Sequence, residues 1–431
     1  MKRIDIKDFR CYTNLSIDFK AGVNLLIGDN GSGKTSLLQA CKYSLSTFFA
    51  GFSDENTKWQ VPKSDDFRVR AVNEETLVGE NPISIQFTQD DLFEGAAGTY
   101  TIEKKSKKNS RPLLKGILGY RDAARDLQAS YYTTDENGTT AISKPLPLFA
   151  SFSTEDIHTV RKISEEQYLE FSNKPSFGYY ECLECNGLLK YWVKRMLVLA
   201  EAEKNQIELD VVRRAIVEAL GADGCGIIDD VKVRPVRRKV YYHFIDGREV
   251  QLDYLSDGYK RLVNIVTDLA FRCVLLNKNV FGADSARRTR GTVIIDEIDM
   301  HLHPRLQAKV LKGLRNAFPE LQFIVATHAP MVMTGVLNDT ENSVTRLRYL
   351  NGAYDAHVVN TYGLSASEIL NLVMDVNPRD MRVDQRIQAL YDDLDNENYA
   401  QAKNKLDELI SEFGETIPDL IQARTILELN S

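Results

Sequence analysis

The segment Gly28-Asp29-Asn30-Gly31-Ser32-Gly33-Lys34-Thr35 constrains the fold of this chain more than any other stretch. It follows the apolar run Val23-Asn24-Leu25-Leu26-Ile27, which predicts an inner parallel strand, and it precedes apolar residues at helical spacing. Glycines let the backbone wrap closely around phosphate, and the start of a helix directs N–H groups and a positive dipole end toward an anion. This context predicts a phosphate-binding P-loop rather than a glycine-rich turn without a nucleotide.

The P-loop pattern assigns a role to individual residues. Lys34 is expected to reach the β- and γ-phosphates, and the Thr35 hydroxyl is expected to bind Mg²⁺. The expected cofactors are therefore ATP and Mg²⁺. The residues expected to hold the nucleotide in and beside the loop are Gly28, Asn30, Gly31, Ser32, Gly33, Lys34, Thr35 and Ser36.

Composition is that of an ordinary globular protein with a full-sized core: 431 residues, 43% of them hydrophobic and 27% charged. The net charge of −7 argues against a surface that is basic throughout, so nucleic acid would have to bind at local patches. No apolar run approaches the ~20 residues that cross a bilayer, and the first residues open directly into a strand pattern. We therefore expect a cytoplasmic protein with no membrane partner.

Two short motifs raise the question of a further metal site. Cys182-Leu183-Glu184-Cys185 has no second cysteine pair and no nearby histidine, so it is interpreted as incidental. His301 and His303 lie two residues apart without an evident third ligand. They are interpreted as part of an interface loop beside the hydrolytic site.

Residues 2–19 alternate between apolar and polar and predict two strands joined by the turn Phe9-Arg10-Cys11-Tyr12. An aromatic or arginine side chain just ahead of a P-loop can stack on an adenine ring. Arg10 or Tyr12 could do so here, and a plain surface turn is the equal alternative.

The middle of the chain alternates between strand and helix patterns. Strands are predicted near residues 82–87, 98–102 and 146–152, helices over 154–220, and strands again over 227–252. Basic residues gather at 104–111 and at 234–239. Both runs are interpreted as solvated surface, with contact to nucleic acid as the alternative.

The strand pattern Thr292-Val293-Ile294-Ile295 ends in two carboxylates, Asp296 and Glu297. Carboxylates directly after a buried strand are costly unless a cation or a water molecule needs them. After a P-loop this is a Walker B element, in which Asp296 belongs to the Mg²⁺ shell and Glu297 takes a proton from the attacking water.

Two further motifs complete the candidate site. The apolar run 321–326 ends in Thr327-His328, and a histidine at this edge of a parallel sheet can sense the γ-phosphate or the attacking water. The segment Leu255-Ser256-Asp257-Gly258-Tyr259 leads into a helix, so it offers a hydroxyl and backbone N–H groups to an anion.

In this order the motifs resemble those of ABC-type ATPases of the SMC and RecF class, and more narrowly those of stand-alone bacterial RecF-like ATPases. The resemblance implies an α/β fold: a P-loop ATPase head with a mixed and parallel sheet flanked by helices, a short inserted helical lobe and a C-terminal helical hairpin. It also implies a head-to-tail homodimer or higher homo-oligomer, in which Ser256 and Gly258 of one subunit complete the site around Lys34 of the other. Proteins of this kind often serve in anti-phage systems such as Septu, PARIS and retron modules, where the ATPase controls a separate effector, often a nuclease.

One element of the class has no clear counterpart. The Q-loop glutamine could be Gln86 or Gln89, or the strand ending at Ser153-Thr154 could hold its position without a glutamine.

The chain is expected to divide into four parts. Residues 1–153 and 223–362 form the two halves of the ATPase head, 154–222 form the helical lobe, and 363–431 form an acidic helical tail that serves as an association surface.

The sequence is also compatible with two rival functions. One is a DNA-repair or recombination ATPase that uses the basic runs, and the other is a scaffold whose bound ATP is not turned over. No acidic cluster or extra domain after His328 indicates a nuclease within this chain.

Overall fold

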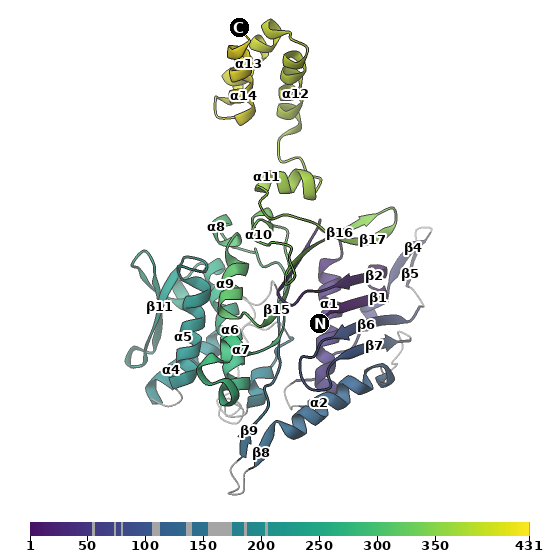
Figure 1. The fold of residues 1–431 in the computed structure, drawn as a ribbon, viewed down its shortest axis with the longest axis vertical. Helices are drawn as coiled ribbons and strands as arrows, with labels where there is room; N and C mark the ends of the chain where they lie inside the picture. The colour runs from purple at the N-terminus through teal and green to yellow at the C-terminus, as the bar shows by residue number, and fades with distance from the viewer. Residues whose placement is uncertain are drawn as a thin grey trace. The chain divides into compact units, whose positions relative to one another are not determined.

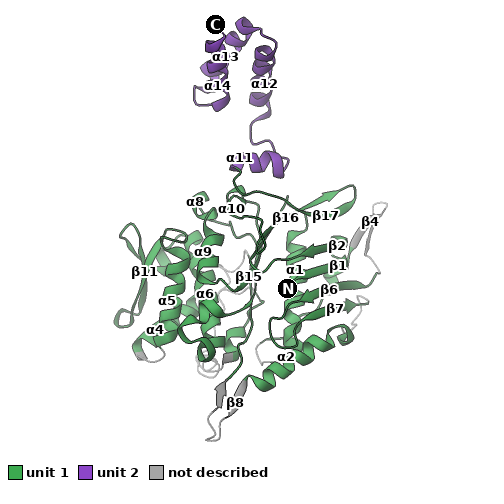
Figure 2. Ribbon diagram, viewed as in Figure 1, with its two compact units in different colours: residues 1–364 green, residues 365–431 purple. Residues whose placement is uncertain are grey.

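The computed structural model describes residues 1–53, 57–72, 75–78, 81–105, 113–134, 140–153, 175–184, 188–202 and 206–430. The chain divides into two compact units, residues 1–364 and 365–431 (Figure 2). In the described part of the chain, no helix combines the length and the apolar character needed to span a membrane.

The centre of the first unit is a six-stranded sheet in the order β10-β14-β15-β3-β16-β17. The first five strands are parallel, and β17 returns antiparallel to β16 as a hairpin. The three innermost strands are wholly buried, which explains their continuous apolar runs. The strands are β3 (Val23–Ile27), β10 (Leu148–Phe152), β14 (Gly291–Ile295), β15 (Leu321–Ala326), β16 (Ser343–Leu350) and β17 (Ala353–Val358).

A second sheet of four antiparallel strands has the order β2-β1-β6-β7. Helix α1 (Lys34–Ser46) contacts both sheets and lies between them (Figure 1). This sandwich holds the helix that follows the P-loop rigidly, because its buried residues include Leu37, Leu38 and Cys41. The strands are β1 (Arg3–Phe9), β2 (Tyr12–Asp18), β6 (Ile83–Gln89) and β7 (Gly98–Lys104), and helix α2 (Leu118–Ser130) packs against β7.

Helices cover the other side of the central sheet (Figure 1). The longest is α6 (Asp257–Phe281), which packs against α4 (Leu189–Ala202) and α5 (Gln206–Leu220). The rest of this region comprises β11 (Ile228–Arg234), β12 (Lys239–Phe244), β13 (Glu249–Gln251), α7 (Ser285–Arg288), α8 (Pro304–Gln307), α9 (Val310–Ala317) and α10 (Pro330–Met333). Two small hairpins, β4 (Val69–Val72) with β5 (Glu75–Val78) and β8 (Tyr132–Thr134) with β9 (Thr140–Ile142), complete the described strands and α-helices of the unit.

Buried ion pairs join the helical region to α6. Arg195 of α4 donates to Glu208 of α5 at 2.7 Å, and Lys278 of α6 donates to the same carboxylate at 2.5 Å. Glu208 is fully buried, so its charge depends on these two partners. The predicted helical lobe and the helix that follows Ser256 are thus bonded together, while residues 154–174 of that lobe lie outside the described part.

The second unit is a small helical bundle with its own apolar core. Helices α12 (Met381–Asp395) and α13 (Tyr399–Phe413) form the predicted hairpin, and α14 (Pro418–Leu429) packs against both. A short helix α11 (Ala366–Glu368) precedes them. The sequence of this unit carries 14 acidic and six basic residues, so it accounts for the negative charge of the whole chain.

The predicted α/β class, with a mixed and parallel sheet flanked by helices, is confirmed by this topology. The third helix of the tail was missed. The segment that begins at Pro304 forms two short helices, α8 and α9, rather than one continuous helix.

Candidate functional site

The candidate site lies at the carboxyl edge of the central sheet. The P-loop follows β3, Asp296 and Glu297 follow β14, and His328 lies two residues beyond β15. Because β15 pairs in parallel with both β14 and β3, these three strand ends lie side by side. A pocket of about 420 Å³ opens there, lined by Cys11, Asn30, Gly31, Gly33, Lys34, Thr35, Ser36, Asp296, Glu297, His328 and Tyr354.

The Lys34 ammonium is held by the loop itself. Its Nζ donates to the carbonyl oxygens of Gly28 at 2.7 Å and Asp29 at 3.0 Å, and it lies 3.5 Å from Nδ1 of His328. The side chain is 6% exposed, and this burial lowers its pKa from 10.5 to about 8, against the opposing effect of nearby carboxylates led by Asp296. Lys34 is therefore a buried cation at the start of α1, where its charge and the helix dipole both favour a bound anion.

The residues predicted to bind Mg²⁺ lie together. The Thr35 hydroxyl donates to Oδ2 of Asp296 at 3.1 Å, so a hard oxygen ligand from the start of α1 and one from the end of β14 converge beside the phosphate loop. Mg²⁺ in nucleotide sites takes one or two protein oxygens plus phosphates and water, and this pair fits that requirement. The described residues contain no group of three or more His, Cys, Asp or Glu side chains that could hold a metal by themselves.

Glu297 and His328 face the same pocket. Glu297 has a left-handed backbone with φ of 47°, a conformation that costs a non-glycine residue ~1–2 kcal/mol. Such strain is often retained where it aims a functional side chain. His328 is half-buried, and the Thr327 hydroxyl beside it donates to Asp299 and accepts from the N–H of Ala329 at 3.0 Å. Asp299 and Thr327, which the sequence did not single out for this role, thus fix the turn that carries the histidine.

Arg10 and Tyr12, either of which could have stacked on adenine, are not among the described residues that line the pocket. Tyr12 is fully buried, and its hydroxyl donates to the Gly33 carbonyl at 2.8 Å, so it supports the loop rather than facing a base. Arg10 pairs instead with the buried carboxylate of Asp66 at 2.7 Å. The aromatic residue that does line the pocket is Tyr354 of β17, which the sequence motifs missed.

The segment with Ser256 and Gly258 lies at the start of α6. Leu255 is buried, whereas Ser256 is exposed and its side chain does not cap the helix. Gly258 is packed against the loop after Walker B, since a Cβ at that position would lie 2.3 Å from the His301 carbonyl oxygen. The serine-bearing turn thus presents its hydroxyl to solvent and not to its own core.

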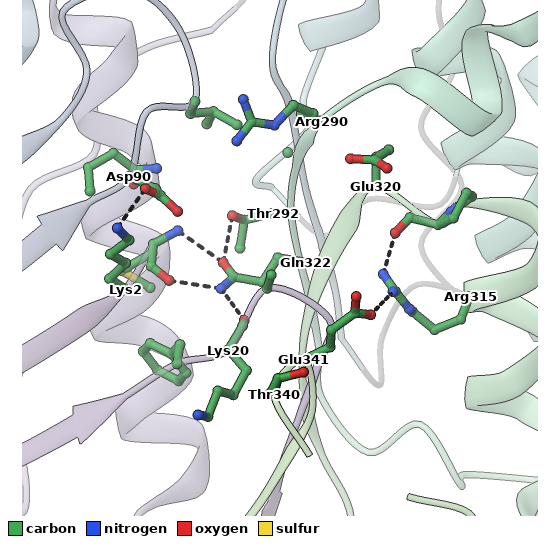
Figure 3. Close-up of a pocket in the computed structure, with 17 residues that line it drawn as sticks. Lys2, Lys20, Asp90, Arg290, Thr292, Arg315, Glu320, Gln322, Thr340 and Glu341 are labelled. Atoms are coloured by element: carbon green, nitrogen blue, oxygen red, sulfur yellow. Dashed lines mark hydrogen bonds and ion pairs between the residues drawn. The ribbon is translucent and has the colours of Figure 1, made fainter. Parts of the chain in front are cut away.

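Neither glutamine considered for the Q-loop reaches the nucleotide pocket. Gln86 is exposed on β6. Gln89 lines another pocket, which lies at the amino ends of the parallel strands. In that pocket Gln322 hydrogen-bonds Thr292 and the backbone of Met1 and Lys20 (Figure 3). Ser153 directly follows β10, whose last residue, Phe152, accepts a hydrogen bond from the N–H of Asp296 at 2.9 Å. This geometry favours the alternative without a glutamine, although Thr154 lies outside the described residues.

The two basic runs, 104–111 and 234–239, differ in how far their described side chains are exposed to solvent. Lys104 is buried and donates to the Pro62 carbonyl at 2.7 Å, so its interpretation as a solvated residue is wrong. Residues 106–111 lie outside the described part. At the second run Arg234 pairs with Glu249 at 2.9 Å, while Arg237 and Arg238 are exposed, as a solvated turn requires.

The lowered pKa of Lys34 leads to a pH prediction. A free-state pKa of about 8 means that the ammonium loses its proton between pH 7 and 9, while a bound triphosphate would hold the proton in place. Affinity for a magnesium nucleotide is therefore expected to fall about tenfold over that range. Isothermal titration calorimetry at pH 7, 8 and 9 measures it. Lys34→Arg, which keeps its charge, should show a flat profile, and an equally steep profile in that variant would contradict the explanation.

The chain is similar in sequence to a protein family and to individual known proteins. A family model described as "AAA domain, putative AbiEii toxin, Type IV TA system" matches residues 23–334. The chain is 23% identical over 421 residues to the retron Vc95 probable ATPase of Vibrio cholerae serotype O1 biovar El Tor, covering 86% of this chain and 78% of that protein. It is 24% identical over 359 residues to the Septu protein PtuA of Bacillus mycoides strain KBAB4, covering 78% of this chain but 39% of that protein.

Among solved structures, the SMC head domain from Thermotoga maritima aligns with a TM-score of 0.41 and 16% identity, over 83% of this chain and 98% of that one. The family resemblance predicted from the motifs is confirmed by the family model and the two relatives.

Proposed function

We infer that this chain, which belongs to the family described as AAA domain, putative AbiEii toxin, Type IV TA system, binds ATP with Mg²⁺, hydrolyses it and dimerises around the bound nucleotide. The observation that carries the inference is the convergence of Lys34, Thr35, Asp296, Glu297 and His328 at one sheet edge. Together these side chains supply a cation, two oxygen ligands for a metal ion, a carboxylate base and a histidine.

The roles follow from the contacts. Lys34 and the N–H groups at the start of α1 bind the phosphates, and Thr35 and Asp296 would hold Mg²⁺, which neutralises charge on the phosphate oxygens. Glu297 accepts a proton from the attacking water, and His328, beside Lys34, senses the terminal phosphate. Phosphate release by the purified chain, with and without Mg²⁺, tests hydrolysis directly, and a chain that releases none in either condition would contradict it.

The dimer is inferred from the serine-bearing turn. Ser256 is exposed at the start of the 25-residue helix α6, whose dipole and free N–H groups favour an anion. The turn makes no contribution to the pocket of its own subunit among the described residues that line it. A second copy placed head-to-tail would bring this turn to the triphosphate of the first and so complete the site.

We further infer that the ATPase controls a separate effector protein in anti-phage defence. The inference is supported by the retron and Septu relatives and by the acidic second unit, which contains none of the candidate catalytic residues and offers a surface for a partner. Mass measurement of the complex purified from its native operon identifies the partner and the number of copies. A chain that purifies without any partner, and whose neighbouring genes encode only replication or repair proteins, would contradict this role.

A second candidate function, action on DNA, is favoured by one observation. A cleft of about 590 Å³ is lined by four cationic side chains, Arg10, Lys42, Lys63 and Lys104, and by one carboxylate, Glu184. Phosphate contacts of this kind release counterions, so affinity should fall steeply with salt. If DNA is a ligand, Lys63→Ala and Lys42→Ala, which remove the exposed and the half-buried lysine of the cleft, should each reduce the salt slope by about one. Binding of duplex DNA measured by fluorescence anisotropy from 50 to 200 mM salt decides it, and an ATPase rate unaffected by DNA would exclude this function.

A further inference from the structure

Tyr354 lies in the nucleotide pocket although no sequence motif points to it. It is half-buried, and among the described residues that line this pocket it is the one Tyr, Phe or Trp side chain. We propose that Tyr354 is the nucleobase contact of the site, with its ring stacked on the base of the bound nucleoside triphosphate. This proposal rests on the proposed function, because it assumes that the P-loop binds such a nucleotide.

The sheet order places Tyr354 at the nucleoside side of the pocket. Strands β14 and β15, which carry Glu297 and His328, flank β3 on one side, and the β16–β17 hairpin flanks it on the other. The terminal phosphate is expected beside Glu297 and His328. A triphosphate that runs from there along the P-loop therefore directs its nucleoside toward the hairpin and Tyr354.

Contacts around Cys11 support this direction. The Cys11 side chain lines the pocket with Ser36 and Tyr354, and its interactions with both oppose part of the rise in its pKa that burial causes. Ser36 follows Thr35, the expected Mg²⁺ ligand, in the first turn of α1. Tyr354 is thus linked through the Cys11 side chain to the start of the helix that follows the phosphate loop.

The Tyr354 ring is held in place before any ligand arrives. It makes an edge contact with the buried Tyr12 at 5.1 Å and a tilted contact with Tyr349 at 4.8 Å, and its hydroxyl donates to the Gly31 carbonyl at 3.4 Å. A ring fixed in this way loses little conformational freedom when a base stacks on it. A buried Tyr12 therefore acts on the base only by positioning Tyr354.

The hairpin itself is fixed to the phosphate loop. Strand β16 pairs in parallel with β3 as far as Arg346 opposite Ile27. The Leu347 carbonyl then approaches Gly28, which has a φ of 143°, so closely that a Cβ there would lie 2.1 Å from the oxygen. The distance between the phosphate site and the Tyr354 ring is therefore set by the sheet.

The experiment compares a ligand that has a base with one that lacks it. Affinities of Mg²⁺-ATP and Mg²⁺-tripolyphosphate are measured by calorimetry on the full chain and on Tyr354→Ala, Tyr354→Leu and Tyr354→Phe. Loss of a stacked ring should weaken ATP about 5- to 150-fold in the Ala and Leu variants and leave tripolyphosphate unchanged, while the Phe variant keeps wild-type affinity. Tyr354→Leu preserves bulk in the hairpin, and thermal melting verifies that each variant is folded.

Tyr362→Ala is the matched control, because Tyr362 is 59% exposed and does not line the pocket. The inference is overturned if Tyr354→Leu weakens both ligands equally, since the hairpin then only supports the loop, or if it weakens neither. Wild-type protein that binds tripolyphosphate as tightly as ATP contradicts the base contact alone. Wild-type protein that binds neither ligand contradicts the proposed function and the base contact with it.

Discussion

Replacing Glu297 with glutamine is expected to lower the rate of ATP hydrolysis by about 10²- to 10⁴-fold, the usual contribution of a general base. Glutamine has nearly the same shape, so it should keep the left-handed backbone at this position, but it cannot take a proton from water. ATP affinity should therefore stay within a few-fold of wild type. Because the dimer would open only after hydrolysis, the variant should accumulate as an ATP-bound dimer.

Two measurements test this expectation together. Single-turnover phosphate release reports the chemical step, and sedimentation velocity with and without Mg²⁺-ATP reports the dimer. Glu320→Gln is the matched control, because Glu320 is exposed at the opposite edge of the same sheet, just before β15. If Glu297→Gln releases phosphate as fast as wild type, the water is activated by another group. If neither protein turns ATP over, the scaffold alternative gains.

The motif-bearing half of the site was predictable because each motif fixes both a residue type and a strand end. Lys34, Asp296 and His328 each follow an apolar run, and parallel strands place their carboxyl ends at one edge. Their lateral order could not be read from the sequence. That β15 lies between β14 and β3, and so puts His328 3.5 Å from Lys34, is a property of the assembled sheet.

The aromatic contact was not predictable from motifs. Tyr12 precedes the P-loop in sequence, but the turn that carries it does not show which way its ring faces, and in the structure it is buried. Tyr354 follows Lys34 by more than three hundred residues and reaches the loop only because β16 pairs with β3. Contacts between distant segments of this kind carry no local signal.

The strand periodicity of β7 indicated that Lys104 is buried, but the run of basic residues that begins there favoured a solvated loop. Residues Tyr100, Ile102 and Lys104 alternate on the buried face of β7, so strand periodicity continues into the basic run. A run of lysines normally indicates a solvated loop, and here the strand ends one residue inside it. The side chain satisfies its buried ammonium at the Pro62 carbonyl.

The second large effect concerns the serine-bearing turn. Ser256→Glu places a negative charge where the proposed dimer holds the partner's γ-phosphate, and like charges at an interface cost several kcal/mol, so ATP turnover should fall by about 10²-fold or more. The monomer should remain folded, because Ser256 is exposed and an acidic residue is favourable at the start of a helix. Ser411→Glu, at an exposed position of α13, is the charge-matched control.

Mixing two inactive variants then shows whether the turn acts across the dimer. Lys34→Ala lacks the phosphate-binding lysine but keeps Ser256, whereas Ser256→Glu keeps Lys34. In a head-to-tail heterodimer one of the two sites combines the intact lysine of one subunit with the intact serine of the other, so an equimolar mixture should recover about a quarter of the wild-type rate. Mixing without nucleotide lets the subunits exchange before ATP is added. A turn that serves its own subunit's pocket would give no recovery at any ratio, because no heterodimer would then contain a complete site.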